Sequence, residues 1–239
     1  MNLTKTLSSA ALFTGLIFAG SASALVINDT GDVSGGAPGG LPIYEAIFDE
    51  TDAGQSFTMH YGHNSGSDNV SATASFLLQT VDLDATGHVV LVIDIENTSV
   101  VSGPSDPRIL SFGFNTNPDI AGAALTSAGT VFDDVDTSTN FPGFHNIDVC
   151  MFAHGCAGGP HHAGLASGFT DQVTITLTGD FSTSNEFTLS DFAMKFQGVD
   201  SYEIPGAPGT PNTPVPAPAT LALLGLGLLG MRAFGRKSA

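Results

Sequence analysis

The side chains best suited to bind a ligand are three aspartates that lie close together, Asp133, Asp134 and Asp136. Oxygen-bearing side chains alternate along this stretch, as they do at the start of a calcium-binding loop. An EF-hand also needs glycine at its sixth position and glutamate at its twelfth, where counting from Asp134 gives Thr139 and His145. The pattern excludes an EF-hand. It leaves two alternatives, a calcium site shared with a neighbouring loop and a solvated acidic loop.

Both cysteines of the chain, Cys150 and Cys156, fall in one predicted loop, CMFAHGCAGG. If the chain is exported, it meets an oxidising compartment, and we expect a disulfide between them. A ring of seven residues contributes about 2 to 2.5 kcal/mol in the chain-entropy model, so the bond fastens a loop rather than the fold. The alternative is a zinc or copper site, because four histidines surround the cysteines: His145, His154, His161 and His162.

The sequence contains no motif that marks a catalytic centre. It lacks the G-x-S-x-G, H-E-x-x-H and P-loop patterns. Arg108 and Lys195 are the only cations in its central part, which leaves little to stabilise an oxyanion or a phosphoryl group. The 23 carboxylates permit glycoside hydrolysis without indicating any particular pair, and the absence of tryptophan argues against a sugar-stacking cleft. We therefore predict that the protein is not an enzyme.

Charge is unevenly distributed along the chain. All 23 acidic residues lie between Asp29 and Glu203, where only two basic residues occur, so this part has a formal charge of −21. A surface of that sign repels nucleic acid and anionic headgroups, whereas it attracts divalent cations and cationic polymers. Nucleic acid is therefore excluded as a partner. No cofactor is predicted, and the charge leaves calcium as the possible exception.

The N-terminal end has the features of a secretory signal peptide. Residues 1–24 contain one lysine, then a short apolar stretch, then a cleavage site of small residues. The apolar stretch is about half the length that a membrane-spanning helix needs. We predict export of the chain and cleavage after Ala24.

The C-terminal end has three parts in a fixed order. A short apolar helix is predicted at about 219–231, and it is too short for stable spanning. By the positive-inside rule, the basic end that follows it stays in the cytoplasm, so the helix is expected to hold the chain in the membrane transiently. The motif before the helix is Val215, Pro216, Ala217 and Pro218, and the basic stop is Arg232, Arg236 and Lys237.

This order resembles the PEP-CTERM sorting signal, with Pro-Ala-Pro in place of the usual Pro-Glu-Pro. The resemblance implies processing by exosortase, a membrane protease or transpeptidase of Gram-negative bacteria that make extracellular polysaccharide. It also implies a secreted or cell-surface location. The alternative is an ordinary C-terminal membrane anchor, and in both cases the domain faces outward.

Three further segments resemble the cistern-type subfamily of PEP-CTERM proteins. They are Phe114 to Pro118, the loop from Asp148 to Gly159 that holds both cysteines, and Phe196 to Gly198. The subfamily has no assigned enzymatic activity, so this resemblance implies an architecture rather than a mechanism.

Between the two ends, six runs alternate apolar and polar residues with the period of two that is typical of strands. No segment shows a helical stripe, which disfavours crossover helices and a parallel sheet. We predict an all-β fold, an antiparallel β-sandwich of jelly-roll or immunoglobulin-like type with long Gly/Pro-rich loops, plus the short C-terminal helix. The strand-like runs are 56–61, 70–81, 89–96, 109–115, 172–179 and 187–196.

The predicted organisation has four parts. They are a signal peptide (1–24), an acidic β-sandwich ectodomain (25–203), a Pro/Gly-rich linker (204–214) and a sorting tail (215–239). Within the ectodomain, residues 25–47 are expected to be loop with at most a short strand on each side. The predicted function is that of a structural or interaction protein of the cell surface, associated with extracellular polysaccharide. The alternatives are a calcium-dependent lectin- or adhesin-like module and, third, an extracellular hydrolase.

Overall fold

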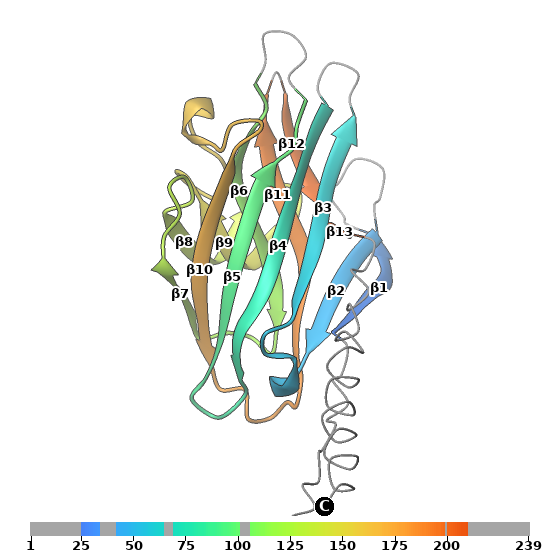
Figure 1. Ribbon diagram of the computed structural model, residues 1–239, viewed down its shortest axis with the longest axis vertical. Helices are drawn as coiled ribbons and strands as arrows, with labels where there is room; N and C mark the ends of the chain where they lie inside the picture. The colour runs from blue at the N-terminus through green and yellow to red at the C-terminus, as the bar shows by residue number, and fades with distance from the viewer. Residues whose placement is uncertain (1–24, 34–41, 65–68, 101–105, 199, 210–239) are drawn as a thin grey trace, which may run out of the picture.

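The computed structural model describes residues 25–33, 42–64, 69–100, 106–198 and 200–209 (Figure 1). The predicted signal peptide, the sorting motif and the apolar helix at 219–231 lie outside these residues. No helix within the described ranges is long and apolar enough to cross a membrane. The described elements are β1 (Val26–Val33), β2 (Pro42–Phe48), η1 (Glu50–Asp52), β3 (Ser56–Asn64), β4 (Asn69–Asp82), β5 (Gly87–Asn97), β6 (Arg108–Asn117), β7 (Gly122–Ser127), β8 (Asp134–Phe141), β9 (His145–Phe152), η2 (His161–Ala163), β10 (Thr170–Gly179), β11 (Phe187–Gln197), β12 (Ser201–Pro205) and β13 (Ala207–Pro208).

These strands form two antiparallel sheets. Sheet A has the order β1, β2, β11, β6, β9, β8, and β12 also pairs with β11. Sheet B has the order β13, β3, β4, β5, β10, β7. In Figure 1 the strands of sheet B lie in front of those of sheet A, and the buried apolar side chains of both form one core between them. The predicted antiparallel β-sandwich is confirmed.

The alternation of side chains explains why these segments are strands. In β5, Val89, Leu91, Ile93 and Ile95 are fully buried, and the residues between them face solvent. Their neighbours on β10 alternate in the same register, with Val173 opposite Ile93. One face of each strand therefore packs in the core and the other faces solvent, as the period of two requires.

Phenylalanine rings hold the two sheets together. Phe57 and Phe76 of sheet B stack with 4.8 Å between ring centroids. Phe76 also packs edge-on against Phe114 and Phe192 of sheet A, at 6.1 and 5.4 Å. Such pairs add about 0.5 to 1.5 kcal/mol each beyond the burial of their area. The core thus has a specific aromatic centre without tryptophan.

Several strands have no clear signal in the sequence. The expectation that residues 25–47 are loop with at most a short strand on each side understates their structure, because β1 and β2 have eight and seven residues, pair with each other, and join sheet A through β11. Strands β7 and β8 lie at the edges of their sheets and have mostly exposed side chains. An edge strand that contributes little to the core shows little apolar alternation, so its sequence resembles a loop.

The predicted domain boundary at Glu203 is also wrong. Residues expected to begin the linker complete both sheets, since β12 pairs with β11 and β13 pairs with β3. Ile204 is buried in the core. A Cβ atom added to Gly206 would lie 3.0 Å from ring carbons of Tyr61, so the chain passes between the sheets where only glycine fits easily. The folded domain therefore extends at least to Gly209.

This boundary predicts the effect of truncation. A chain of residues 25–203 loses the buried Ile204 side chain and the pairing of β13, and we expect its free energy of unfolding to be about 3 kcal/mol or more below that of residues 25–209. Urea unfolding followed by circular dichroism measures the difference. A chain of residues 25–214 should match 25–209, and equal stability of all three would contradict the corrected boundary.

Candidate functional site

The predicted disulfide between Cys150 and Cys156 is present, with 6.1 Å between the Cα atoms. Cys150 lies in β9 rather than in a loop, and both cysteines are buried. The bond fastens residues 153–169, here called the cover loop, to the outer face of sheet A. Beneath it lies a second apolar cluster, separate from the main core, made of Phe141, Ile147, Cys150, Phe152, Cys156 and Ala193.

Both cations of the central part of the chain also hold the cover loop in place. Arg108 pairs with Asp106 at 3.0 Å and donates to the carbonyl oxygens of His162 and Gly164 at 3.3 and 3.1 Å.

Lys195 is buried and forms an ion pair with Glu203. A Cβ atom on Gly158 of the cover loop would lie 2.8 Å from Lys195 Cε, so the loop backbone lies directly on the lysine stem. Within the described residues, no lysine or arginine is therefore left unpaired to meet an anionic ligand.

Asn97 joins the cover loop to sheet B. This fully buried side chain donates to the carbonyl oxygens of Pro107 and Leu165, each at 2.8 Å, and its own oxygen accepts from the Ser99 backbone at 3.1 Å. Each group of the amide is therefore satisfied, as burial requires. The position of the loop thus depends on a polar contact that reaches both sheets.

The zinc or copper alternative is contradicted by the disulfide, because the sulfurs bonded to each other are not thiolates. Of the four histidines, His161 lies with its Nε2 2.8 Å from the carbonyl oxygen of Asp106, and His154 and His162 are exposed. Throughout the described part of the chain, no group of three or more His, Cys, Asp or Glu side chains could hold a metal ion.

The three aspartates predicted to bind calcium do not form a loop. Asp134 and Asp136 lie in β8, an extended edge strand, where both are exposed, and Asp133 immediately precedes it. Asp134 Oδ1 accepts from the Val135 backbone at 2.9 Å. Calcium binding there stays a prediction. A calcium-dependent rise in melting temperature that is lost in Asp134→Asn would support it, and an unchanged melting curve would contradict it.

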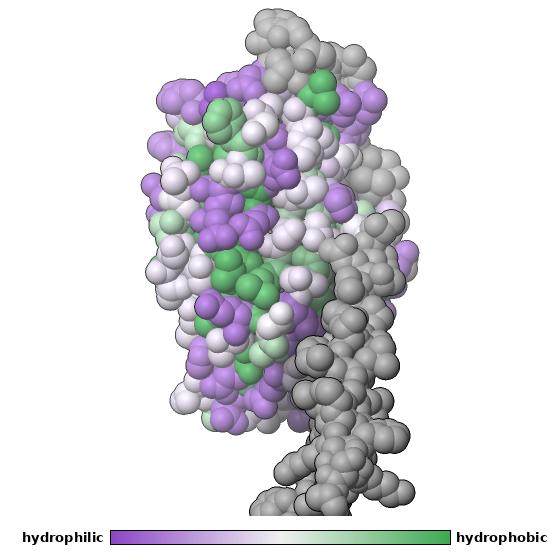
Figure 2. All heavy atoms as spheres, viewed as in Figure 1, coloured by the Kyte–Doolittle hydropathy of each residue, from purple (hydrophilic) through white to green (hydrophobic). Residues whose placement is uncertain are grey.

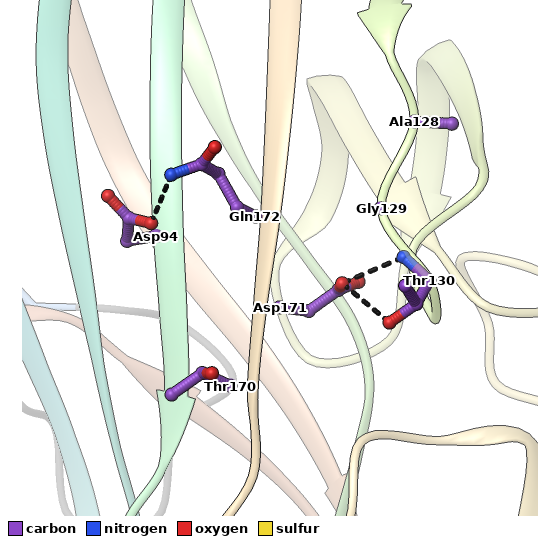
Figure 3. Close-up of a pocket in the computed structure, with 7 residues that line it drawn as sticks. All are labelled: Asp94, Ala128, Gly129, Thr130, Thr170, Asp171 and Gln172. Carbon is purple, nitrogen blue, oxygen red and sulfur yellow. Dashed lines mark hydrogen bonds between the residues drawn. The ribbon is translucent and has the colours of Figure 1, made fainter.

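The structure adds a shallow cavity of about 280 Å³ that the sequence did not indicate (Figure 3). It lies where β10 continues past the end of β7, so that the loop at 128–130 forms one wall. Asp94 of β5 and Gln172 of β10 are opposite each other in the sheet, and Gln172 Nε2 donates to Asp94 Oδ1 at 2.6 Å. Thr170 and Asp171 complete the lining.

Asp171 holds the loop that forms this wall. Its carboxylate accepts hydrogen bonds from the backbone N–H groups of Thr130, Val131 and Phe132 at 2.8 to 2.9 Å, and from the Thr130 hydroxyl at 2.9 Å. Burial alone would raise the pKa of Asp171, but these four hydrogen bonds outweigh it and lower the pKa. A Cβ atom on Gly129 would lie 2.2 Å from the carboxylate, so only glycine fits there.

A signal for Asp171 does exist in the sequence. Asp171 lies two residues before Val173. It is on the same inward side of β10 as Val173, Ile175 and Leu177, which are all buried in the core. A lone carboxylate on the apolar side of a strand must find hydrogen-bond donors. Three of its four donors are backbone groups about forty residues away, which no side-chain pattern reveals.

The fold and these contacts define an all-β domain with a disulfide-fastened cover loop, followed by a C-terminal tail. The family model of the PEP-CTERM protein-sorting motif matches residues 214–237 of that tail. The resemblance to this sorting signal is therefore confirmed, and the motif implies an exported protein of Gram-negative bacteria that exosortase processes. No curated protein and no solved structure matches the chain. Membership of the cistern-type subfamily stays a prediction.

The Asp171 carboxylate predicts a stability difference that depends on pH. In Asp171→Asn an amide N–H₂ replaces one acceptor oxygen, and we expect the free energy of unfolding at pH 7 to fall by about 2 to 4 kcal/mol. Because the folded-state pKa is lowered, the stabilisation is complete above the usual aspartate pKa of about 3.9 and is lost as the pH falls through the folded value. The difference in free energy of unfolding between the unchanged protein and Asp171→Asn should therefore become smaller at acidic pH.

Urea unfolding between pH 7 and pH 3 measures this gap. Asp94→Asn is the matched control, since Asp94 lines the same cavity but is exposed, and we expect a change within about 0.5 kcal/mol. A gap for Asp171→Asn no larger than that of the control would refute the role assigned to Asp171.

Proposed function

We propose that this chain is a non-enzymatic structural or interaction protein of the cell surface and its polysaccharide matrix, delivered there by exosortase. The observation that carries the proposal is the match of the PEP-CTERM motif to residues 214–237, a few residues beyond a folded domain that extends to Gly209. A sorting signal at that place presents the domain outside the membrane and leaves its fold intact when the tail is removed.

The proposed order of events follows from the two ends of the chain. The signal peptide is removed after Ala24 during export. The apolar run at 219–231 then holds the chain in the inner membrane, with Arg232, Arg236 and Lys237 on the cytoplasmic side. Exosortase acts near Val215 to Pro218, and the released domain enters the matrix or is attached to it.

The charges inside the domain support a binding or structural role over catalysis. Arg108 and Lys195 are both engaged in ion pairs. Asp171 is saturated with hydrogen-bond donors, so it is suited to hold a loop rather than to move a proton.

A second cavity, of about 410 Å³, is lined by η1 and two turns. Its carboxylates Asp49 and Glu50 accept from the backbone N–H groups of Thr51 and Leu83 at 2.7 and 3.0 Å. These contacts cap turns and fasten η1 to the end of sheet B, which is a structural use of both groups.

The proposal predicts where the chain is found and how it ends. With exosortase present, we expect the extracellular protein to lack the apolar run at 219–231, because cleavage falls near the motif. Without exosortase, or with Pro216→Ala and Pro218→Ala together, the uncleaved chain should remain in the membrane fraction. Intact-mass spectrometry of the extracellular and membrane fractions measures both.

The matched control exchanges two prolines just before the motif, Pro211→Ala and Pro214→Ala, and should be processed normally. An extracellular protein that retains residues 219–231 in the presence of exosortase would overturn the processing step. An extracellular protein absent from purified matrix polysaccharide would overturn the matrix association alone.

A further inference from the structure

We propose that the outer face of sheet B, formed by β3, β4, β5 and β10, is a binding platform for an uncharged polysaccharide chain. The cavity between Asp94, Gln172 and the loop at 128–130 forms its polar end. This inference rests on the proposed matrix function and specifies the chemical class of the partner and the surface that meets it.

The charge of this face differs from that of the rest of the domain. Of the 23 acidic residues, only Asp82, Asp94 and Glu96 lie on the solvent side of these four strands, and no lysine or arginine does. Asp82 lies 3.3 Å from the ring of His88, and Asp94 accepts from Gln172. This face therefore has a formal charge of −3, a small part of the −21 of the domain.

Hydroxyl groups take the place of charges on the face. The outward positions of a solvated sheet hold polar side chains, and here serine and threonine occupy many of them. Thr58 and Ser75 lie side by side across two strands, with 3.0 Å between their hydroxyl oxygens. The outward hydroxyl residues are Ser56, Thr58, Ser71, Thr73, Ser75, Thr80, Thr170, Thr174, Thr176 and Thr178.

Aliphatic side chains form the centre of the face. Leu77 of β4, Val92 of β5 and Thr174 of β10 are register partners in one row across the sheet, and Val90 lies one row away. Leu77 is 37% exposed. Figure 2, which views sheet B from outside, shows hydrophobic surface in the middle of the face with hydrophilic and near-neutral surface around it.

This combination fits a sugar chain better than a protein or an ionic polymer. A neutral sugar ring has C–H groups that pack on aliphatic side chains and hydroxyls that exchange hydrogen bonds with serine and threonine. A second copy of this domain would bring two charges of −21 together, which self-repulsion disfavours. An anionic polysaccharide would need a free cation, and both central cations are paired. A cationic polymer would favour the acidic loops over this face.

The cavity supplies directed hydrogen bonds at one end of the platform (Figure 3). One oxygen of Asp94 accepts from Gln172, and its other oxygen, which points away from Gln172 in Figure 3, can accept from a sugar hydroxyl. Gln172 and Thr170 also line the cavity and offer further polar groups. Because Asp171 and Thr130 bond each other, the wall stays rigid. Without aromatic platforms each contact is weak, so the affinity is expected to depend on several contacts along one chain.

The test uses the released protein as exported and the extracellular polysaccharide of the exporting bacterium, separated by anion exchange into neutral and acidic fractions. Affinity electrophoresis in gels that contain each fraction measures binding. We expect retention by the neutral fraction and at least tenfold weaker binding for Val92→Asp and Thr174→Asp, which place a charge in the central row. Gln172→Ala should weaken binding by removing the polar end.

Thr137→Asp on β8 is the matched control, since it adds the same charge at an exposed strand position of sheet A. Melting curves confirm that each variant is folded, and two charge variants keep the test valid if one of them fails to fold. Retention by the acidic fraction alone, or neutral binding that neither charge variant weakens, would overturn this inference and leave the matrix function standing. Binding to neither fraction would overturn the polysaccharide association as well.

Discussion

The aromatic contact between the sheets is the interaction on which the rest of the structure depends. Phe57 and Phe76 from one sheet meet Phe114 and Phe192 from the other, and this closes one face of each sheet against water. Each sheet is then left with one outer face, and the two outer faces differ. Sheet A carries a second apolar cluster beneath the cover loop, whereas sheet B is open. A function that needs an exposed flat surface can use the outer face of sheet B.

The few cations of the domain explain how that asymmetry is maintained. Arg108 and Lys195 both lie at the cover loop, where one donates to loop carbonyls and the other supports Gly158. Together with the disulfide and Asn97, they hold the loop on sheet A. Repulsion among the remaining carboxylates opposes association between copies of the domain, and the outer face of sheet B carries only three of them on β3, β4, β5 and β10.

The sequence pattern predicted the strands whose own side chains alternate between the core and solvent. Strands with a neighbour on each side, such as β5 and β10, alternate strictly because one face enters the core. The disulfide was also predictable, since Cys150 and Cys156 have only each other as partners. Edge strand β8 was missed because few of its side chains are buried. The end of β12 and all of β13 were assigned to the linker because of their prolines. Pro205 ends a strand and Pro208 lies on a sheet edge, where a missing N–H is tolerated.

Asp171 was missed because its backbone partners are distant in the chain.

The corrected end of the domain changes how the sorting tail must work. If the fold extends to Gly209, residues 210–214 are all that separate it from Val215, and even fully extended they span at most about 18 Å. That is roughly two Debye lengths at physiological ionic strength, so an acidic domain held there still experiences some repulsion from anionic headgroups. Under the proposed processing, the tail holds the domain against this repulsion. Cleavage near Pro216 removes the apolar anchor and leaves the charge of the domain unchanged, so the repulsion is no longer opposed and favours departure of the released domain from the membrane.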